Sequence, residues 1–267
     1  MKIATVAFDT AWKNPPANIK QTEKHVAAVM KRWPKTQVIL FPEISLMGFV
    51  VDPSNAEIAE PLNGKSMTEI KRIARKFHVA LVCSMIEENP GGVKPFNSTF
   101  AVSGKGELLA VYHKNHLFTE SAEPEVFSPG AELAVFELDG WRCGLSTCFD
   151  IRFPRLFEAY KKAGVELMLS PFNWVHGRNK PTIMEHLVKA RAHENQFFFA
   201  AVDRTGSDPN TSYYGTSIIS NPYCEDNSER DGIYSYAEIS KDDIANLAKA
   251  LPLDASFKER YKVGKGW

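Results

Sequence analysis

The sequence predicts an α/β protein with two mixed β-sheets covered by helices. Strand-like apolar runs alternate with helical patterns along all 267 residues, some strands are joined by hairpin signals, and others are joined through helices. Hairpins connect antiparallel strands and crossover helices connect parallel ones, so the mixture indicates mixed sheets. Because no linker rich in Pro, Gly or Ser divides the chain, we expect a single domain over residues 1–267, with a core over residues 2–240 and a C-terminal helix and tail over residues 240–267.

The first half of the chain contains well-marked helices and strands. Helical spacing of apolar residues predicts a helix over residues 19–32, which Pro34 ends. A capping-box pattern predicts a second helix over residues 66–77. We interpret residues 103–106, Ser-Gly-Lys-Gly, as a turn and not as a phosphate-binding loop. Apolar, β-prone runs predict strands at residues 2–8, 37–41, 79–86, 96–102 and 108–112.

The second half continues the alternation. Asp139-Gly140 is a strong hairpin signal. Helical patterns predict helices over residues 154–163 and 181–195, and Ser240 caps a last helix that is followed by an irregular tail. Residues 226–231 are expected to form an acidic, polar loop. The predicted strands are residues 135–138, 141–145, 167–170, 197–203, 216–220 and 233–239.

Composition excludes several classes of protein. Hydrophobic residues make up 44% and charged residues 24%, which is ordinary for a globular protein. Lys plus Arg and Asp plus Glu number 32 each, so without a basic excess we expect no nucleic-acid partner. No apolar run reaches the roughly 18 residues of a membrane helix, and the first residues do not resemble a signal peptide, so we expect no membrane association. Four cysteines without metal-ligand spacing predict a reducing cytoplasm, no metal and no cofactor.

Cys148 lies in the most informative segment, residues 144–154, which read Gly-Leu-Ser-Thr-Cys-Phe-Asp-Ile-Arg-Phe-Pro. An apolar strand ends in small residues, the cysteine follows, and a helix begins at Pro154. A nucleophile at such a strand-to-helix turn is exposed beside backbone N–H groups that can bind a developing oxyanion. By contrast, Cys83 and Cys143 lie within predicted strands, and we interpret them as inert core thiols.

Two further strands end in groups that suit the same chemistry. Glu43 follows the strand at residues 37–41, and Lys114 follows the strand at residues 108–112. Functional groups in α/β folds collect at strand ends, so Glu43, Lys114 and Cys148 could converge at one mouth. Taken singly, a surface carboxylate, a surface lysine and a structural cysteine are the simpler interpretations.

Taken together, three motifs resemble the nitrilase (carbon–nitrogen hydrolase) superfamily: Phe-Pro-Glu43, Lys114-Asn-His-Leu-Phe and Cys148-Phe-Asp-Ile-Arg-Phe-Pro. The resemblance runs from Lys2 to about Tyr261. It implies an α-β-β-α four-layer sandwich, homodimers that pack into larger assemblies, and a Glu-Lys-Cys triad that needs no metal and acts on a small-molecule amide.

The resemblance also implies a role for each site residue. Glu43 is the general base, Lys114 and the backbone N–H of Phe149 bind the oxyanion, and Cys148 forms a thioester. An ordinary thiol, with a pKa of about 8.5, is protonated at neutral pH and needs such a base. Family members carry a second glutamate that holds the substrate amide and the triad in place. Glu123 occupies that position, although Glu120 and Glu125 are nearby.

Neighbouring polar residues receive structural roles. We expect His116 to brace the loop that carries Lys114. Asp150 and Arg152 are expected to fix the turn after Cys148, through backbone hydrogen bonds or a mutual ion pair.

The residues after the nucleophile resemble the ω-amidase-like branch, which removes ammonia from ω-amides of 2-oxo acids such as 2-oxoglutaramate and 2-oxosuccinamate. A substrate that carries a carboxylate needs a cation to bind it. The segment after the strand at residues 167–170 should border the pocket. We expect Phe49, Phe172, Asn173 and Trp174 to contact the substrate, and His176 or Arg178 to bind its carboxylate.

Three alternatives stay open. The first is a related amidase that acts on another aliphatic, deaminated-peptide or carbamoyl amide. The second is a papain-like hydrolase that uses His176, His186 or His193 as base and does not need Lys114. The third is a non-catalytic binding protein on the same fold.

Overall fold

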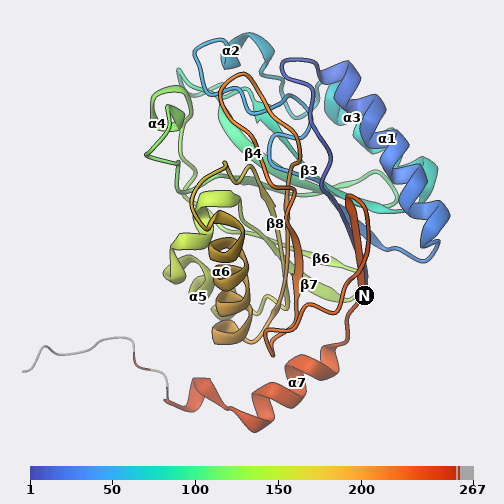
Figure 1. Ribbon diagram of the computed structural model, residues 1–267, viewed down its shortest axis with the longest axis vertical. Helices are drawn as coiled ribbons and strands as arrows, with labels where there is room; N and C mark the ends of the chain where they lie inside the picture. The colour runs from blue at the N-terminus through green and yellow to red at the C-terminus, as the bar shows by residue number, and fades with distance from the viewer. Residues whose placement is uncertain (257, 259–267) are drawn as a thin grey trace, which may run out of the picture.

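The computed structural model describes residues 1–256 and 258, and its elements form four layers (Figure 1). The larger sheet has seven strands in the order β11 (Glu229–Asp231), β12 (Tyr234–Glu238), β1 (Lys2–Val6), β2 (Val38–Leu40), β3 (Ala80–Glu87), β4 (Phe96–Val102) and β5 (Leu108–His113). The smaller sheet has five strands in the order β10 (Ser217–Ser220), β9 (Phe198–Asp203), β8 (Leu167–Phe172), β7 (Trp141–Leu145) and β6 (Ala134–Leu138). Both sheets contain parallel and antiparallel pairs, as the sequence predicts.

Helices cover the outer face of each sheet. The larger sheet is covered by α1 (Pro15–Arg32) and α3 (Lys65–Phe77), and the smaller sheet by α5 (Pro154–Lys162) and α6 (Lys180–Asn195). The short elements α2 (Asn55–Ile58), α4 (Glu123–Val126) and the 3₁₀ helix η1 (Cys148–Arg152) lie in connections. The last elements are α7 (Lys241–Ala250) and the 3₁₀ helix η2 (Leu253–Ser256). This arrangement confirms the expected α-β-β-α sandwich.

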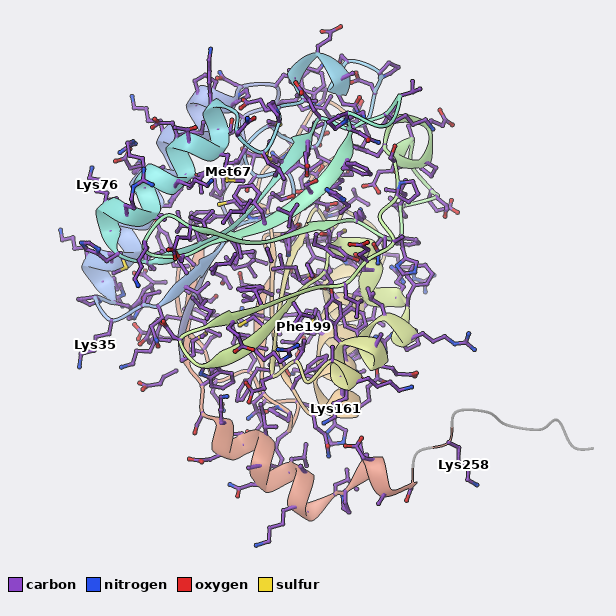
Figure 2. All side chains as sticks on the ribbon, turned by 180° about the vertical axis from the view of Figure 1, so that it is seen from behind. Lys35, Met67, Lys76, Lys161, Phe199 and Lys258 are labelled. Atoms are coloured by element: carbon purple, nitrogen blue, oxygen red, sulfur yellow. The ribbon has the colours of Figure 1, made fainter. Side chains whose placement is uncertain are left out.

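Three apolar cores hold the four layers together. The first joins α1 and α3 to the larger sheet through residues such as Val26, Ile70 and Phe100. The second lies between the sheets and includes Val38, Leu145 and Leu169. The third joins α5 and α6 to the smaller sheet through Phe157, Val188 and Phe199. Figure 2 shows Met67 and Phe199 inside the layers and Lys35 and Lys76 on the surface. The strands β2, β3, β8 and β9 therefore bury both faces, which explains their nearly continuous apolar runs.

Several local predictions are confirmed. Asp139 and Gly140 have φ angles of 48° and 77°, the left-handed values that a two-residue hairpin turn of this type requires. Helix α5 begins at Pro154. The hydroxyl of Ser240 accepts a hydrogen bond from the backbone N–H of Asp242 and caps α7.

The capping box predicted at residue 66 is wrong. Helix α3 begins at Lys65, and the Ser66 backbone N–H and hydroxyl both donate to the carboxylate of Glu60, at 2.8 and 2.7 Å. A side chain from the preceding loop thus caps the helix in place of the helix's own first turn.

The acidic loop predicted at residues 226–231 is partly wrong as well. Its second half forms the edge strand β11, whose residues are charged and exposed, so it lacks the apolar alternation that identifies a strand. Glu229 ties this strand to α1 through Arg32 and the indole N–H of Trp33, at 2.9 and 3.1 Å.

The C-terminal helix α7 leaves the layered body, and only Leu247 in it is buried (Figure 1). The expected irregular tail lies mostly outside the described residues. Within the residues that the structure describes, no helix is both long and apolar enough to span a bilayer.

His25 on α1 is buried, and its Nδ1 lies 2.8 Å from the Tyr234 hydroxyl. Burial lowers the pKa of His25 from 6.5 to about 4. The unfolded chain therefore binds this proton more readily, so the stability contributed by neutral His25 is complete above pH 6.5 and is lost as the pH falls towards 4. We predict that His25→Gln reduces the loss of stability between neutrality and about pH 5 by about 2 kcal/mol. Urea unfolding at both pH values measures this difference, and equal losses in the two proteins would contradict it.

Candidate active site

Glu43, Lys114 and Glu123 form one buried ionic cluster. The Lys114 ammonium donates to Oε1 of Glu43 and to Oε1 of Glu123, each at 2.8 Å. The three side chains are no more than 1% exposed. Glu43 follows β2, Lys114 follows β5, and Glu123 begins α4, so the end of the larger sheet assembles the cluster. The structure thus brings together the predicted base, cation and second glutamate.

The smaller sheet completes the surroundings of Glu43. Asn173, just beyond β8, donates its backbone N–H to Oε2 of Glu43 at 2.8 Å, and its side-chain amide to the Glu43 carbonyl at 2.9 Å. The amide of Asn97 on β4 donates to Oε1 at 2.7 Å. A carboxylate has about four acceptor positions. The bonds from Lys114, the Asn97 amide and the Asn173 backbone N–H occupy three of them, so one position on Oε2 is left.

Cys148 follows β7 as the first residue of η1, at the predicted strand-to-helix turn. Its thiol lies 3.7 Å from the Asn173 carbonyl. Asp150 fixes the turn, since its Oδ2 accepts the Thr147 backbone N–H at 2.9 Å, and its Oδ1 accepts the His116 backbone N–H at 3.0 Å. These bonds confirm the expected role of Asp150. They also fasten the loop of Lys114 to the turn of Cys148.

The expected ion pair between Asp150 and Arg152 does not form. Instead, Oδ1 of Asp150 lies 2.7 Å from Nδ1 of His116, and Oδ2 accepts the Tyr112 hydroxyl at 2.8 Å. The Arg152 guanidinium lies over the ring of Trp174, with its Cζ 4.8 Å from the ring centroid.

Strained backbone lies at Cys148 and directly after Glu43. Cys148 has φ 46°, and Ile44, directly after Glu43, has φ 44°. Left-handed backbone costs a non-glycine residue roughly 1–3 kcal/mol and is especially unfavourable for a β-branched one such as isoleucine. The Ile44 carbonyl accepts the backbone N–H groups of Met47 and Gly48, at 3.1 and 2.9 Å, which hold this turn.

The cluster carries one more negative than positive charge when both glutamates are ionised. Burial raises the pKa of Cys148 well above its usual value, Glu43 and Glu123 raise it further, and Lys114 opposes them. Burial also raises the pKa of Glu123, against the effect of Lys114. Burial disfavours the Lys114 ammonium, but Glu123 and Glu43 outweigh this and raise its pKa. The resting thiol is therefore neutral, and Glu43 is the charged group with the largest effect on its pKa.

A small pocket lies over Cys148 and has a volume of about 20 Å³. This is about the space that one water molecule needs, and it lies far below the roughly 300–1,000 Å³ of drug-sized ligand sites. Of the predicted contact residues, Asn173 and Trp174 line the pocket, together with Phe149. The other lining residues are Phe118, Arg152, Val175 and Lys180.

Four predicted contact residues are not among the lining residues. Phe49 is buried in the core beneath the larger sheet, and Phe172 is fully buried with its ring 5.7 Å from that of Trp174. His176 is exposed and stacks on Tyr214, with ring centroids 4.2 Å apart. Arg178 is also exposed. The segment is right, but the cations that reach the pocket are Arg152 and Lys180.

The sequence-based reasoning missed Asn97. The signal was a polar run, Asn97-Ser98-Thr99, inside a strand whose other residues are apolar. All three are fully buried, and Thr99 also points to the site, with its hydroxyl 2.9 Å from that of Thr147 beside the nucleophile.

Within residues 1–256 and 258, no group of three or more His, Cys, Asp or Glu side chains is arranged to hold a metal ion.

Comparison with known proteins identifies the family of the chain. A sequence model described as carbon-nitrogen hydrolase matches residues 2–249. The chain belongs to the carbon–nitrogen hydrolase family. This confirms the resemblance inferred from the motifs, and it assigns the protein to hydrolases of carbon–nitrogen bonds.

Relatives and solved structures of this family match nearly the whole chain. The chain is 28% identical over 267 residues to a 2-oxoglutaramate amidase of Bacillus subtilis. The alignment covers 97% of this chain and 98% of that protein. It is 32% identical over 210 residues to the omega-amidase NIT2 of Danio rerio, covering 74% of each. Saccharomyces cerevisiae Nit3, a nitrilase-superfamily member, superimposes with a TM-score of 0.87 at 25% identity, covering 98% of this chain and 97% of Nit3.

The buried charges lead to a prediction about the Cys148 thiol. Glu43→Gln removes a negative charge that raises the thiol pKa, so this pKa should fall. Lys114→Met removes the opposing positive charge, so the pKa should rise. Thiolate absorbance followed against pH, with Cys148→Ala subtracted, gives both midpoints. Shifts in the same direction would contradict this account of the cluster.

Proposed function

We propose that this protein is an amidase that hydrolyses a small carboxamide to a carboxylate and ammonia through a thioester on Cys148. The observation that carries the proposal is the buried Glu43–Lys114–Glu123 cluster beside a thiol at a strand-to-helix turn. Nucleophile, base and cation are the groups that acyl transfer from an amide needs.

In the acylation step, the Cys148 sulfur attacks the amide carbon while Glu43 takes the thiol proton. The acceptor position left on Oε2 of Glu43 can receive it. The third N–H of the Lys114 ammonium and the backbone N–H of Phe149 stabilise the oxyanion. The carbon–nitrogen bond then breaks, and the proton held by Glu43 leaves with ammonia.

In the second step, Glu43 removes a proton from water, which attacks the thioester carbon and releases the acid and the Cys148 thiol. Glu123 does not exchange protons in this scheme. It binds Lys114 at 2.8 Å and the Phe118 backbone N–H at 2.8 Å, so it positions the ammonium and one wall of the pocket.

We infer further that the substrate is an ω-amide of a 2-oxo acid, with 2-oxoglutaramate and 2-oxosuccinamate as the first candidates. One observation supports this substrate class. The relatives include a 2-oxoglutaramate amidase that spans 97% of the chain.

The geometry gives no support to a papain-like site. None of His176, His186 and His193 lines the pocket over Cys148. His176 and His186 are exposed, and Nδ1 of His193 lies 2.8 Å from the Pro222 carbonyl.

The substrate assignment predicts rapid ammonia release from 2-oxoglutaramate and 2-oxosuccinamate, and none from either with Cys148→Ala. The reason is that, among the described residues, Cys148 supplies the only thiol or hydroxyl group that lines the pocket. An enzymatic ammonia assay on a panel that includes neutral aliphatic amides measures this. Release only from neutral amides would retain the chemistry and overturn the substrate, whereas undiminished release by Cys148→Ala would overturn the mechanism.

The role of the cation predicts that Lys114→Met lowers kcat by about 10²–10³-fold, because an oxyanion donor is lost. The matched variants His176→Gln, His186→Gln and His193→Gln should each retain activity. Steady-state kinetics on one amide compares the four proteins. An active Lys114→Met together with an inactive histidine variant would favour the papain-like alternative.

A further inference from the structure

Two cations that line the pocket over Cys148 lie over one aromatic ring. The ammonium of Lys180, on the first turn of α6, lies 4.7 Å from the ring centroid of Trp174. The guanidinium carbon of Arg152, at the end of η1, lies 4.8 Å from the same centroid. Phe118 and Phe149 extend this aromatic surface, at 5.8 Å from Lys180 Nζ and 5.9 Å from Arg152 Cζ.

Neither cation has an acidic partner in the described part of the chain, where no carboxylate lies within 4.0 Å of either one. The nearby acids are used elsewhere. Asp150 accepts bonds from Tyr112 and from the Thr147 and His116 backbones. Asp203 accepts three backbone N–H groups, of which that of Trp174 is the shortest at 2.7 Å.

This arrangement is electrostatically unfavourable on its own. Burial lowers the pKa of Lys180, and the positive charge of Arg152 lowers it further. Two like charges that converge on an apolar hollow repel each other, and an anion between them would relieve the repulsion. Lys180 is half-buried and Arg152 is exposed, so low screening strengthens such a contact mainly at Lys180.

The platform beneath the two cations is fixed. The indole N–H of Trp174 donates to the Lys180 carbonyl at 2.7 Å, which ties the ring to the start of α6. The Trp174 backbone N–H is held by Asp203. Lys180 and Arg152 therefore start from anchored positions, and only their flexible ends need to order when a ligand binds.

We propose that Lys180 and Arg152 form an anion subsite that binds the carboxylate of the substrate while its amide lies at Cys148. The subsite deepens the proposed function and rests on it, since it gives the enzyme a preference for monoamides of small dicarboxylic acids over neutral amides. It replaces His176 and Arg178 as the residues that recognise the carboxylate. It also offsets the excess negative charge of the cluster, which would otherwise repel an anionic substrate.

The test uses two amides of equal length, glutaramate and pentanamide, which differ by a carboxylate in place of a methyl group. For Lys180→Met and Arg152→Met we expect kcat/KM on glutaramate to fall by about 10- to 100-fold each, mainly through KM, because a charge-assisted contact is lost. Activity on pentanamide should change by less than about threefold. Lys180→Arg should retain the preference for glutaramate, and Arg155→Met, an exposed cation on α5, is the matched control.

Two results would overturn the subsite. One is a wild-type protein that prefers pentanamide. The other is an equal loss on both amides in the two variants, which would mean that the cations act on the thiol or on the fold. The rate of Cys148 alkylation by neutral iodoacetamide checks this point, since the subsite predicts no change in it.

Failure of the proposed function gives a different pattern. If glutaramate is hydrolysed with the expected dependence on Lys180 and Arg152 but 2-oxoglutaramate is not, the subsite stands and the 2-oxo-acid assignment fails. If no amide is hydrolysed, titration calorimetry of glutaramate with Cys148→Ala decides. Binding that weakens about 10- to 100-fold on adding Lys180→Met supports the subsite, and binding that does not weaken, or is absent, overturns it.

Discussion

The pairing of one buried ammonium with two buried carboxylates is the constraint on which the rest of the site depends. Unpaired charges cannot remain in such an interior, so Glu43 and Glu123 are stable there only because Lys114 lies between them. One negative charge is left over, and this charge disfavours a second anion at Cys148. The same interaction that stabilises the fold locally thus keeps the Cys148 thiol protonated, and in the proposed mechanism it makes proton transfer to Glu43 part of the reaction.

The charges at the buried end of the site and at its mouth have opposite signs. The excess negative charge lies at the buried end of two strands, and the cations Arg152 and Lys180 lie at the pocket mouth. Between them is a small aromatic hollow in which fields are weakly screened. An elongated substrate with a carboxylate at one end and a neutral amide at the other matches this polarity, whereas the reverse orientation would place its carboxylate against the glutamates.

Much of the fold could be predicted because its signals are local. Apolar runs, the Asp139-Gly140 turn and the start of α5 at Pro154 identify the elements without tertiary information. Edge strand β11 was not predicted because a charged strand at the rim of a sheet needs no apolar face. Among the site residues, Glu43, Lys114 and Cys148 were visible because each follows a strand within a recognisable motif.

The remaining site residues depend on tertiary structure. Asn97 looks like any polar residue in a strand until Glu43 is placed beside it. The sequence favours His176 or Arg178 as the cation that binds the carboxylate, and Arg178 lies two residues from Lys180. Asn179 between them has left-handed backbone, with φ 55°, and no sequence pattern determined which of the two neighbours it would direct to the pocket.

Asn173 has a consequence for how activity relates to folding. It extends from the smaller sheet and clamps both the side chain and the carbonyl of Glu43, which belongs to the larger one. Cys148 and Glu43 therefore come into register only when the two sheets are docked. Turnover by the proposed mechanism would report the docking of the two halves of the sandwich, and a state with intact sheets that had slipped apart would retain its secondary structure and be catalytically silent.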